Sequence, residues 1–317
     1  MKKAVFIPLI IAGALVITGG AITAIAFANG AFQPEAGSIT KEYKIEESFK
    51  DFDIDCDISN ITFKKSEGDE CKVVCVEKEK LYHEVKVADG TLKIEQVDNY
   101  QWYEKFTWNF NQSVTIYLPL DSYDNLKIRN STGNIDTDIA LTLKKVDVKV
   151  STGNINVSNL NVEGEFKLES STGNHNLKHI KCECADLTAD TGHIEVSDLT
   201  ANTYVTAKTS TGHKSFKTIR CESASLESST GHTTLDDFIA TGHLSIEAST
   251  GDVKLKNSDA DTLKIHTTTG HVKGNLLTDK LFRCKSKTGD VETPATSGPI
   301  CEVETTTGDI YLTVGAI

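Results

Sequence analysis

The sequence predicts an all-β protein: a single-stranded parallel β-helix, or β-solenoid, of about 19–20 residues per rung, preceded by one N-terminal transmembrane helix. Three observations predict this fold: a tenfold repeat, apolar columns within the repeat, and a glycine at the same place in every copy. Each copy holds a threonine, a glycine and then Asn, His or Asp, and successive glycines are 19 or 20 residues apart. Such a short fixed period indicates a repeat architecture. The glycines, which we expect at structural corners, are Gly133, Gly153, Gly173, Gly192, Gly212, Gly231, Gly251, Gly270, Gly289 and Gly308.

Apolar and polar positions alternate before each glycine. The residues seven and five positions before it are apolar in every copy, as at Leu126 and Ile128, whereas the residue between them, such as Lys127, is polar. After the glycine the apolar positions change phase and fall mainly two, four and seven residues on. Gly, Asn, Asp and His adopt positive φ more readily than other residues, so the change of phase marks a corner. Each repeat is expected to form strand, corner, strand and turn, and to return one rung higher, about 4.8 Å along the axis.

Other repeat folds fit less well. An antiparallel sandwich would not stack equivalent columns in register. The leucine-rich spacing L-x-x-L-x-L and the calcium-binding nonapeptide G-G-x-G-x-D are both absent. The parallel β-helix is therefore the preferred fold for residues 126–317, which form the regular β-helix of ten repeats.

The N-terminal segment is uncharged from Ala4 to Ala28, which is 25 residues and long enough to span a hydrocarbon core that needs about 20. Lys2 and Lys3 precede it and place the N-terminus in the cytoplasm and the rest of the chain outside. A signal peptide cleaved after the A-x-A site that ends at Ala28 is the alternative. A signal core usually runs only about 7–15 residues, which favours a retained membrane anchor at residues 1–28, followed by a linker at 29–37.

Residues 38–125 are rich in strand patterns but do not follow the repeat. Terminal repeats of a solenoid are usually atypical, so we expect this irregular β region to cap one end. It contains an aromatic segment at residues 100–110. If these side chains are exposed, we expect them to stack on sugar rings or lie at a membrane interface. The alternative is that they pack into the end of the solenoid. Packing is the preferred interpretation. The candidate ligand contacts in this segment are Tyr100, Trp102, Tyr103 and Trp108.

The strand Val114–Pro119, the following Leu126-Lys127-Ile128 and the Ser-Thr-Gly-Asn-Ile run resemble a bacterial envelope family, the putative adhesins of the LiaG-like and head-GIN-like type. The resemblance covers about residues 38–317. It implies a β-helical domain of unknown function in the cell envelope, often tethered by one N-terminal helix, and it supplies no catalytic residues. Histidine after the glycine departs from the Asn or Asp expected in this family.

The residue after the glycine offers one candidate metal site, formed by His193, His213, His232 and Asp252. These residues would lie on neighbouring rungs, and imidazole and carboxylate are ligands of zinc and copper. The preferred alternative is that this column serves the backbone conformation of the corner, a property that Asn, Asp and His share, and stacks as a ladder. No metal and no cofactor is therefore predicted. Protonation of the three histidines below about pH 6.5 is expected to loosen this corner.

Eight cysteines in an exported protein would suggest disulfides, but the repeat geometry argues against most pairs. Cys182 and Cys221 share a column two rungs apart, roughly 9–10 Å, which is beyond the reach of a disulfide. The other cysteines fall mostly on apolar faces. We therefore predict buried free thiols.

Composition and motifs exclude several functions. The net charge of −12 argues against a nucleic-acid partner, which would need a basic face. The sequence contains no nucleophile motif and no phosphate-binding loop, and outward charges such as Lys208 and Glu227 recur with the repeat, as a solvated surface does. The chain is therefore predicted not to be an enzyme, and a polysaccharide-active enzyme is the least favoured alternative.

The preferred function is a non-enzymatic, membrane-anchored protein of the cell envelope whose extracellular solenoid presents a surface for adhesion or binding. The alternative is a regulatory or structural partner of envelope-stress or other membrane proteins. The expected partners are the membrane, through residues 4–28, and a cell-wall glycan or an envelope protein. Secretion without an anchor is the alternative location. The sequence ends beside its last corner without a polar cap, at Tyr311–Ile317, which predicts an open edge and end-to-end association.

Overall fold

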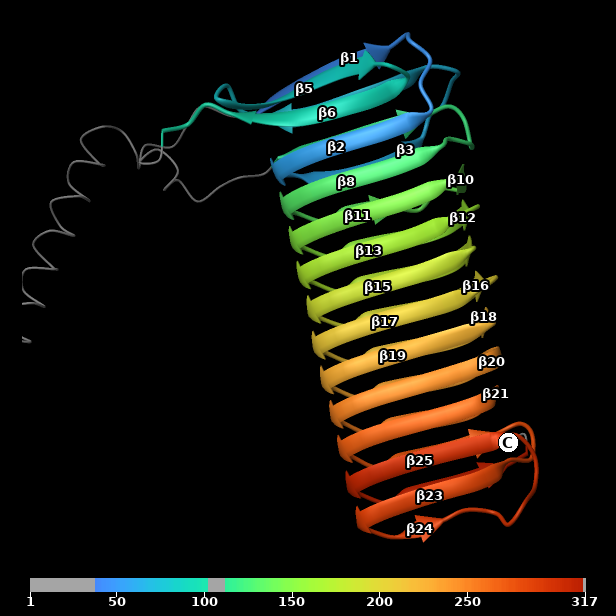
Figure 1. Cartoon of the computed structure of the whole chain (residues 1–317). Coiled ribbons are helices and arrows are strands. Elements are labelled where there is room, and N and C mark those ends of the chain that lie inside the picture. Colours follow the sequence, from blue (N-terminus) through green and yellow to red (C-terminus); the bar gives the residue numbers. More distant parts are fainter. Residues whose placement is uncertain (1–37, 102–111, 316–317) are drawn as a thin grey trace, which may run out of the picture.

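The computed structural model describes residues 38–101 and 112–315, in which the chain is all-β, with 26 strands and no helix (Figure 1). Most strands pair in parallel with the equivalent strand of a neighbouring repeat, so the predicted β-solenoid is confirmed. Within these residues no helix is long and apolar enough to cross a membrane. The transmembrane helix predicted in residues 1–28 lies outside the described residues.

Two rows of strands stack along the solenoid axis. The first row holds the strands that precede each glycine corner. In stacking order they are β6 (Thr91–Asp98), β2 (Asp51–Ile58), β8 (Asn125–Thr132), β11 (Lys145–Thr152), β13 (Glu165–Thr172), β15 (Cys184–Thr191), β17 (Tyr204–Thr211), β19 (Ser223–Thr230), the ends of β20 (Thr233–Thr250) and β21 (Val253–Thr269), β25 (Ile300–Thr307) and β23 (Leu281–Thr288).

The second row holds the strands that follow the corner. In the same order they are β7 (Ser113–Leu118), β3 (Asn60–Lys65), β9 (Ile135–Thr137), β12 (Ile155–Val162), β14 (His175–Cys182), β16 (Ile194–Ala201), β18 (Lys214–Cys221), the beginnings of β20 and β21, β22 (Val272–Leu276), β26 (Ile310–Val314) and β24 (Val291–Glu292). The short β10 (Leu141–Leu143) continues the rung of β9 and pairs with the end of β12.

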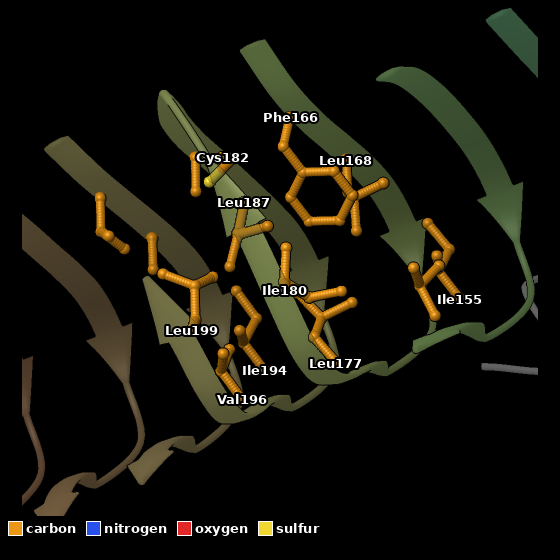
Figure 2. Packing of buried hydrophobic residues seen from close by; sticks show 14 of the residues in the cluster. Ile155, Phe166, Leu168, Leu177, Ile180, Cys182, Leu187, Ile194, Val196 and Leu199 are labelled. Atoms are coloured by element: carbon orange, nitrogen blue, oxygen red, sulfur yellow. The ribbon is translucent and has the colours of Figure 1, made fainter. Parts of the chain in front are cut away.

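The positions predicted to face inward form one continuous core. Val146 and Val148 are each 1% exposed, and their neighbours on the next rung, Phe166 and Leu168, are fully buried. Figure 2 shows Phe166 and Leu168 of the first row packing toward Ile180 of the second row. A single rung cannot bury its apolar face, so the fold is stabilised by stacking rung on rung.

Each rung turns a second time, six residues after the glycine, at a position that the sequence pattern did not identify. A non-glycine residue adopts a left-handed conformation there in six rungs, with φ between 47° and 61°. The change of apolar phase between the fourth and seventh residues after the glycine was the signal for this corner. The residues at the second corner are Asn159, His179, Asp198, Thr218, Asp237 and Asn257.

The N-terminal end of the solenoid is covered by antiparallel strands. β1 (Ile39–Ile45) pairs antiparallel with β4 (Cys71–Glu77), which pairs antiparallel with β7, and β5 (Leu81–Ala88) pairs antiparallel with β6. Antiparallel pairing ends the parallel stack, because a further parallel rung would need the opposite strand direction. β2 and β3 themselves form a regular rung, with Ser59 and Asn60 in the places of the corner glycine and its following asparagine.

The last two repeats exchange places at the C-terminal end (Figure 1). β25 pairs with β21 on one side and with β23 on the other, so the tenth repeat stacks on the eighth and the ninth is outermost. The prediction that every repeat rises one rung is therefore wrong, and the outermost rung is the ninth repeat rather than the tenth, which contains Tyr311. Pro294 explains the exchange: proline donates no ladder hydrogen bond and is confined to sheet edges. It leaves the ninth repeat only β24, two residues long, after its corner, whereas the tenth has the complete strand β26.

Candidate functional site

The glycine corners require glycine for two reasons. Gly212 has φ of 153°, and a Cβ added there would lie 1.7 Å from the carbonyl oxygen of Gly192 on the neighbouring rung. The same close approach occurs at the other corners of the repeat. The sequence pattern predicted the backbone conformation, and the stacking adds a steric exclusion of every side chain.

The residues after the glycines form a continuous hydrogen-bonded ladder on the outside of the corner. The side chain of each residue accepts a hydrogen bond from the backbone N–H of the equivalent residue on the next rung. Asn60 begins the ladder at the N-terminal rung. The bonds, with the donor first, are Asn134–Asn60 (2.9 Å), Asn154–Asn134 (2.8 Å), Asn174–Asn154 (2.9 Å), His193–Asn174 (2.8 Å), His213–His193 (2.9 Å), His232–His213 (3.0 Å), Asp252–His232 (2.9 Å), His271–Asp252 (2.9 Å), Asp309–His271 (3.0 Å) and Asp290–Asp309 (3.1 Å).

This ladder explains why only Asn, Asp and His occupy the column. Each offers an acceptor atom, Oδ1 or Nδ1, at the same distance from the backbone. A histidine in the ladder must be neutral with its proton on Nε2, because a protonated ring has no acceptor nitrogen. Burial and the neighbouring His193 and His232 rings lower the pKa of His213, which favours this neutral form.

The three adjacent histidines of the candidate metal site lie together as a stack. The rings of His193, His213 and His232 are parallel within 4°, with successive centroids 5.0 Å apart. Equivalent nitrogens of such rings are also about 5 Å apart, whereas two nitrogens on one zinc ion lie within about 4 Å. Metal binding by His193, His213, His232 and Asp252, the less favoured alternative from the sequence, stays untested, and it would require the rings to leave this stack.

Replacing His193, His213 and His232 together by asparagine is expected to stabilise the protein in acid and leave it unchanged at pH 8. Asparagine keeps an acceptor for the ladder but does not titrate, so it retains the ladder hydrogen bond, about 1 kcal/mol or less, that protonation of His213 would remove in acid. Thermal melting at pH 8 and pH 5 measures this difference. Equal losses between the two pH values in variant and parent protein would contradict the role of the ladder.

Polar side chains also line the inside of the same corner, where the sequence pattern anticipated apolar residues. The column two residues after the glycine contains His175 and Lys214 among isoleucines and valines, and both are at most 1% exposed. His175 Nε2 lies 2.9 Å from Ser170 Oγ, and Lys214 Nζ donates to the carbonyl oxygen of Glu227 at 2.9 Å. Their departure from the column's apolar pattern was the available signal.

Replacing Lys214 by methionine is expected to stabilise the protein at neutral pH. Burial lowers the pKa of Lys214 to about 8 from its ordinary value of 10.5. The folded state therefore binds this proton less tightly than the unfolded state, and stability should rise between about pH 8 and 10.5. After allowing for the lost hydrogen bond, we expect a gain of about 2 kcal/mol at pH 7. Urea unfolding at pH 7 and pH 10 tests this, and a less stable variant at pH 7 would contradict it.

A flat hydroxyl face runs along the first row of strands, beside the corner. We define it by two positions of each repeat. The residue two positions before the glycine is mostly serine, and the residue one position before it is always threonine. The ten threonines are exposed and pair in register from rung to rung. A shallow groove of about 450 Å³ crosses five successive rungs of this face, and Ser210, Ser229 and Ser249 lie at its centre.

Charged side chains border the hydroxyl face and pair between rungs. Lys208 lies 3.1 Å from Glu227, and Lys149 lies 3.1 Å from Glu169. Exposed pairs of this kind contribute little stability, typically below about 1 kcal/mol. They keep charges of both signs at the rim of the groove, so the surface offers hydroxyl, carboxylate and ammonium groups at the spacing of the rungs.

The other predicted site residues lie elsewhere. Tyr100 is buried, with the Lys80 ammonium 5.7 Å from its ring centre, and the remaining aromatics of its segment, Trp102, Tyr103 and Trp108, lie outside the described residues. All eight cysteines are free, and six of them are buried, in agreement with the predicted thiols.

The chain is similar to one family of known proteins. The model of the Toastrack DUF4097 family matches residues 49–235 and 203–315. The chain belongs to this family. The predicted resemblance to a family of β-helical domains of unknown function is thereby confirmed. No curated protein matches this Toastrack chain.

Three crystal structures are similar to the Toastrack chain. A putative adhesin from Bacteroides fragilis is 18% identical, with a TM-score of 0.44 over 89% of this chain and 98% of its own. A putative lipid binding protein from Parabacteroides distasonis is 14% identical, with a TM-score of 0.45 over 87% and 97%, respectively. A putative adhesin from the same organism is 12% identical, with a TM-score of 0.37 over 87% and 98%.

Proposed function

We propose that the chain is a non-enzymatic, adhesin-like protein of the cell envelope that binds an elongated, polyhydroxylated polymer, such as a cell-wall glycan, along its hydroxyl face. The observation that supports this proposal is the in-register column of exposed threonines beside a groove that crosses five rungs. A glycan strand lying along the solenoid axis would meet the same donors and acceptors at every rung, about 4.8 Å apart.

Many weak contacts would provide the affinity. Each exposed hydroxyl replaces water by a sugar hydroxyl at little net gain, typically about 1 kcal/mol, but the solenoid holds the whole array rigid before binding. The contacts then add along one polymer chain, because each bound sugar keeps the next one near the surface. The paired charges at the rim would accept or donate further hydrogen bonds and disfavour apolar ligands.

Changing Ser210, Ser229 and Ser249 together to alanine is expected to weaken glycan binding at least tenfold. The probes are insoluble peptidoglycan, in a pelleting assay, and soluble wall polysaccharides, with the purified full chain in detergent. Thr200→Ala with Ser215→Ala is the matched control, because both residues are exposed on second-row strands. Unchanged binding by the serine variant would exclude this face. Loss of binding only in Trp102→Ala with Trp108→Ala would assign it to the aromatic segment.

We also propose that residues 4–28 anchor the chain in the membrane, with the solenoid outside the cell. The support is the uncharged 25-residue stretch behind Lys2 and Lys3. Cell fractionation should find the full-length chain in the membrane, degraded by protease added to intact spheroplasts. A soluble chain that begins after Ala28 would instead establish secretion with a cleaved signal peptide.

A second copy of the chain is a candidate partner for the C-terminal edge, which is the outer side of β23 and β24. Leu281 and Val291 there are 40% and 44% exposed, and among the described strands β23 pairs with β25 alone. The antiparallel cap blocks the other end, so two copies would meet edge to edge about a twofold axis. Arg283, Lys285 and Lys287 on β23 would repel their symmetry mates, so we expect association to increase with salt.

Leu281→Lys with Val291→Lys is expected to abolish this dimer, whereas Ile39→Lys at the opposite, capped end should not affect it. Ile39 is a fair control because it is 43% exposed, like the edge residues. Sedimentation equilibrium of the full chain in density-matched detergent measures the association. A monomer at all concentrations in high salt would contradict self-association. An envelope protein would then be the candidate partner for this edge.

A further inference from the structure

A second cluster of chemically reactive side chains lies in the N-terminal cap, away from the hydroxyl face. Cys75 and Glu77 are on β4 and His83 is on β5, and none is more than 1% exposed. One donor atom from each residue lies within 4.8 Å of the others. His83 Nδ1 lies 3.4 Å from Glu77 Oε2.

The His83 ring presents an unpartnered nitrogen to this cluster. Nδ1 is buried and has no hydrogen-bond partner, whereas Nε2 lies 2.9 Å from the hydroxyl oxygen of Ser59. A buried nitrogen without a partner is unfavourable by about 1–3 kcal/mol unless something else satisfies it. The ring is therefore held in place on one side and unsatisfied on the side that faces Glu77 and Cys75.

The surrounding hydrogen bonds are compatible with a His83 ring that carries its proton on Nε2. Gln96 Oε1 accepts the backbone N–H groups of Asp57 and Ile58 at 2.8 and 2.6 Å, so its amide nitrogen is the donor to Ser59 Oγ at 3.3 Å. Ser59 Oγ accepts that amide proton with one lone pair and can accept the Nε2 proton of His83 with the other. In this tautomer the lone pair of Nδ1 points into the cluster, as metal ligation requires.

Glu77 divides its two oxygens between different partners. Oε1 forms an ion pair with the ammonium of Lys41, which approaches from the surface. Oε2 accepts the backbone N–H of His83 at 2.9 Å and faces Nδ1. A cation can therefore use Oε2 while Lys41 keeps Oε1.

We propose that Cys75 Sγ, Glu77 Oε2 and His83 Nδ1 bind one Zn²⁺ ion, with a water molecule as the fourth ligand. Two ligands of a tetrahedral zinc site are about 3.3–3.9 Å apart, so the His83–Glu77 pair is already at this separation and the sulfur needs a shift of about 1 Å or less. Sulfur, nitrogen and oxygen donors together suit zinc better than calcium or magnesium, which prefer oxygen alone. Binding replaces the thiol proton of Cys75 by the metal and releases that proton to solvent.

The same residues do not suit a hydrolase. Ser59, His83 and Glu77 have the order of a catalytic triad, but the Ser59 hydroxyl is 1% exposed, and Nδ1 forms no hydrogen bond to the carboxylate. A nucleophile must reach its substrate. A structural ion needs no such access, and it would join the β4–β5 hairpin, through His83 and Ser59, to the first corner of the ladder.

The test uses the full chain, purified in detergent after chelator treatment and then given one equivalent of Zn²⁺ or Co²⁺. We expect one tightly held zinc per chain after dialysis, a higher melting temperature, and a thiolate-to-cobalt absorption band with Co²⁺. Cys75→Ser and Glu77→Gln should weaken zinc binding at least tenfold. Cys71→Ser is the matched control, because Cys71 is also buried on β4 but is not in the cluster.

Two results would overturn the proposal. One is parent protein that retains no zinc and shows no thiolate band with Co²⁺, an outcome that does not depend on the folding of any variant. The other is a folded Cys75→Ser protein that binds zinc as tightly as the Cys71→Ser control, which would place the metal elsewhere.

Discussion

Gly212→Ala should destabilise the solenoid by about 4 kcal/mol or more, enough to prevent folding of a protein of ordinary stability. The substitution adds one methyl group at a position with φ of 153°, where L-residues with a side chain are strained by about 1–3 kcal/mol. The new Cβ would also lie 1.7 Å from the carbonyl oxygen of Gly192, a contact that forces two rungs apart. The position of a Cβ is fixed by its own backbone, and the carbonyl oxygen is a backbone atom, so no side-chain rotation relieves the overlap.

The loss should propagate beyond one rung. Separating the rungs at Gly212 also lengthens the ladder bond from the His213 N–H to His193 Nδ1, which is 2.9 Å in the intact corner. Urea unfolding of the full chain, followed by circular dichroism, measures the effect. Gly68→Ala is the control: Gly68 lies in a surface turn with nothing within 4 Å of an added Cβ, and its replacement should change stability by less than about 1 kcal/mol. Similar stability of the two variants would show that the corners tolerate side chains.

The protein is expected to lose about 3 kcal/mol of stability between pH 6.5 and pH 4 because of His175 alone. Burial lowers the pKa of His175 to about 4 from its ordinary value of 6.5. In this interval the unfolded chain binds a proton that the folded chain excludes, so the free energy of unfolding falls as the pH falls and levels off below about pH 4. The residue is fully buried, so solvent screening does not reduce the effect.

His175→Ile should remove this pH dependence and also stabilise the protein at neutral pH. Isoleucine occupies the same column on both neighbouring rungs, at Ile155 and Ile194, so the core has the right shape for it. The change also removes a buried nitrogen, Nδ1, that has no hydrogen-bond partner. His243→Asn, on the exposed surface, is the control. The slope of stability against pH between 6.5 and 4 should decrease in His175→Ile only. An unchanged slope would mean that the folded protein admits the proton at this site.

These two residues show how far the sequence pattern reaches. Gly212 was predicted as a corner because it recurs in all ten copies, and the reason was local: glycine adopts positive φ. His175 was not predicted as a buried group. The column two residues after the glycine was identified from its apolar members, and a single histidine in that column gives no periodic signal. The stacking of this column as a ladder was anticipated, but its hydrogen bonds were not. They join residues at least 19 positions apart and become visible only when rungs are stacked.

The two ends of the solenoid are where the sequence pattern predicted least, because their structure depends on contacts between rungs. By itself the sequence determined the fold class, the rung length, the corner glycines and the inward columns, because each depends on residues within one repeat and on a period shared by all ten. Only the tertiary structure decided which repeat lies outermost, how antiparallel strands cap the first rung, and that Cys75, Glu77 and His83 meet. Those outcomes depend on which whole rungs become neighbours. At the C-terminal end Pro294 shortens the ninth repeat and places it outermost, and at the N-terminal end antiparallel strands end the parallel stack.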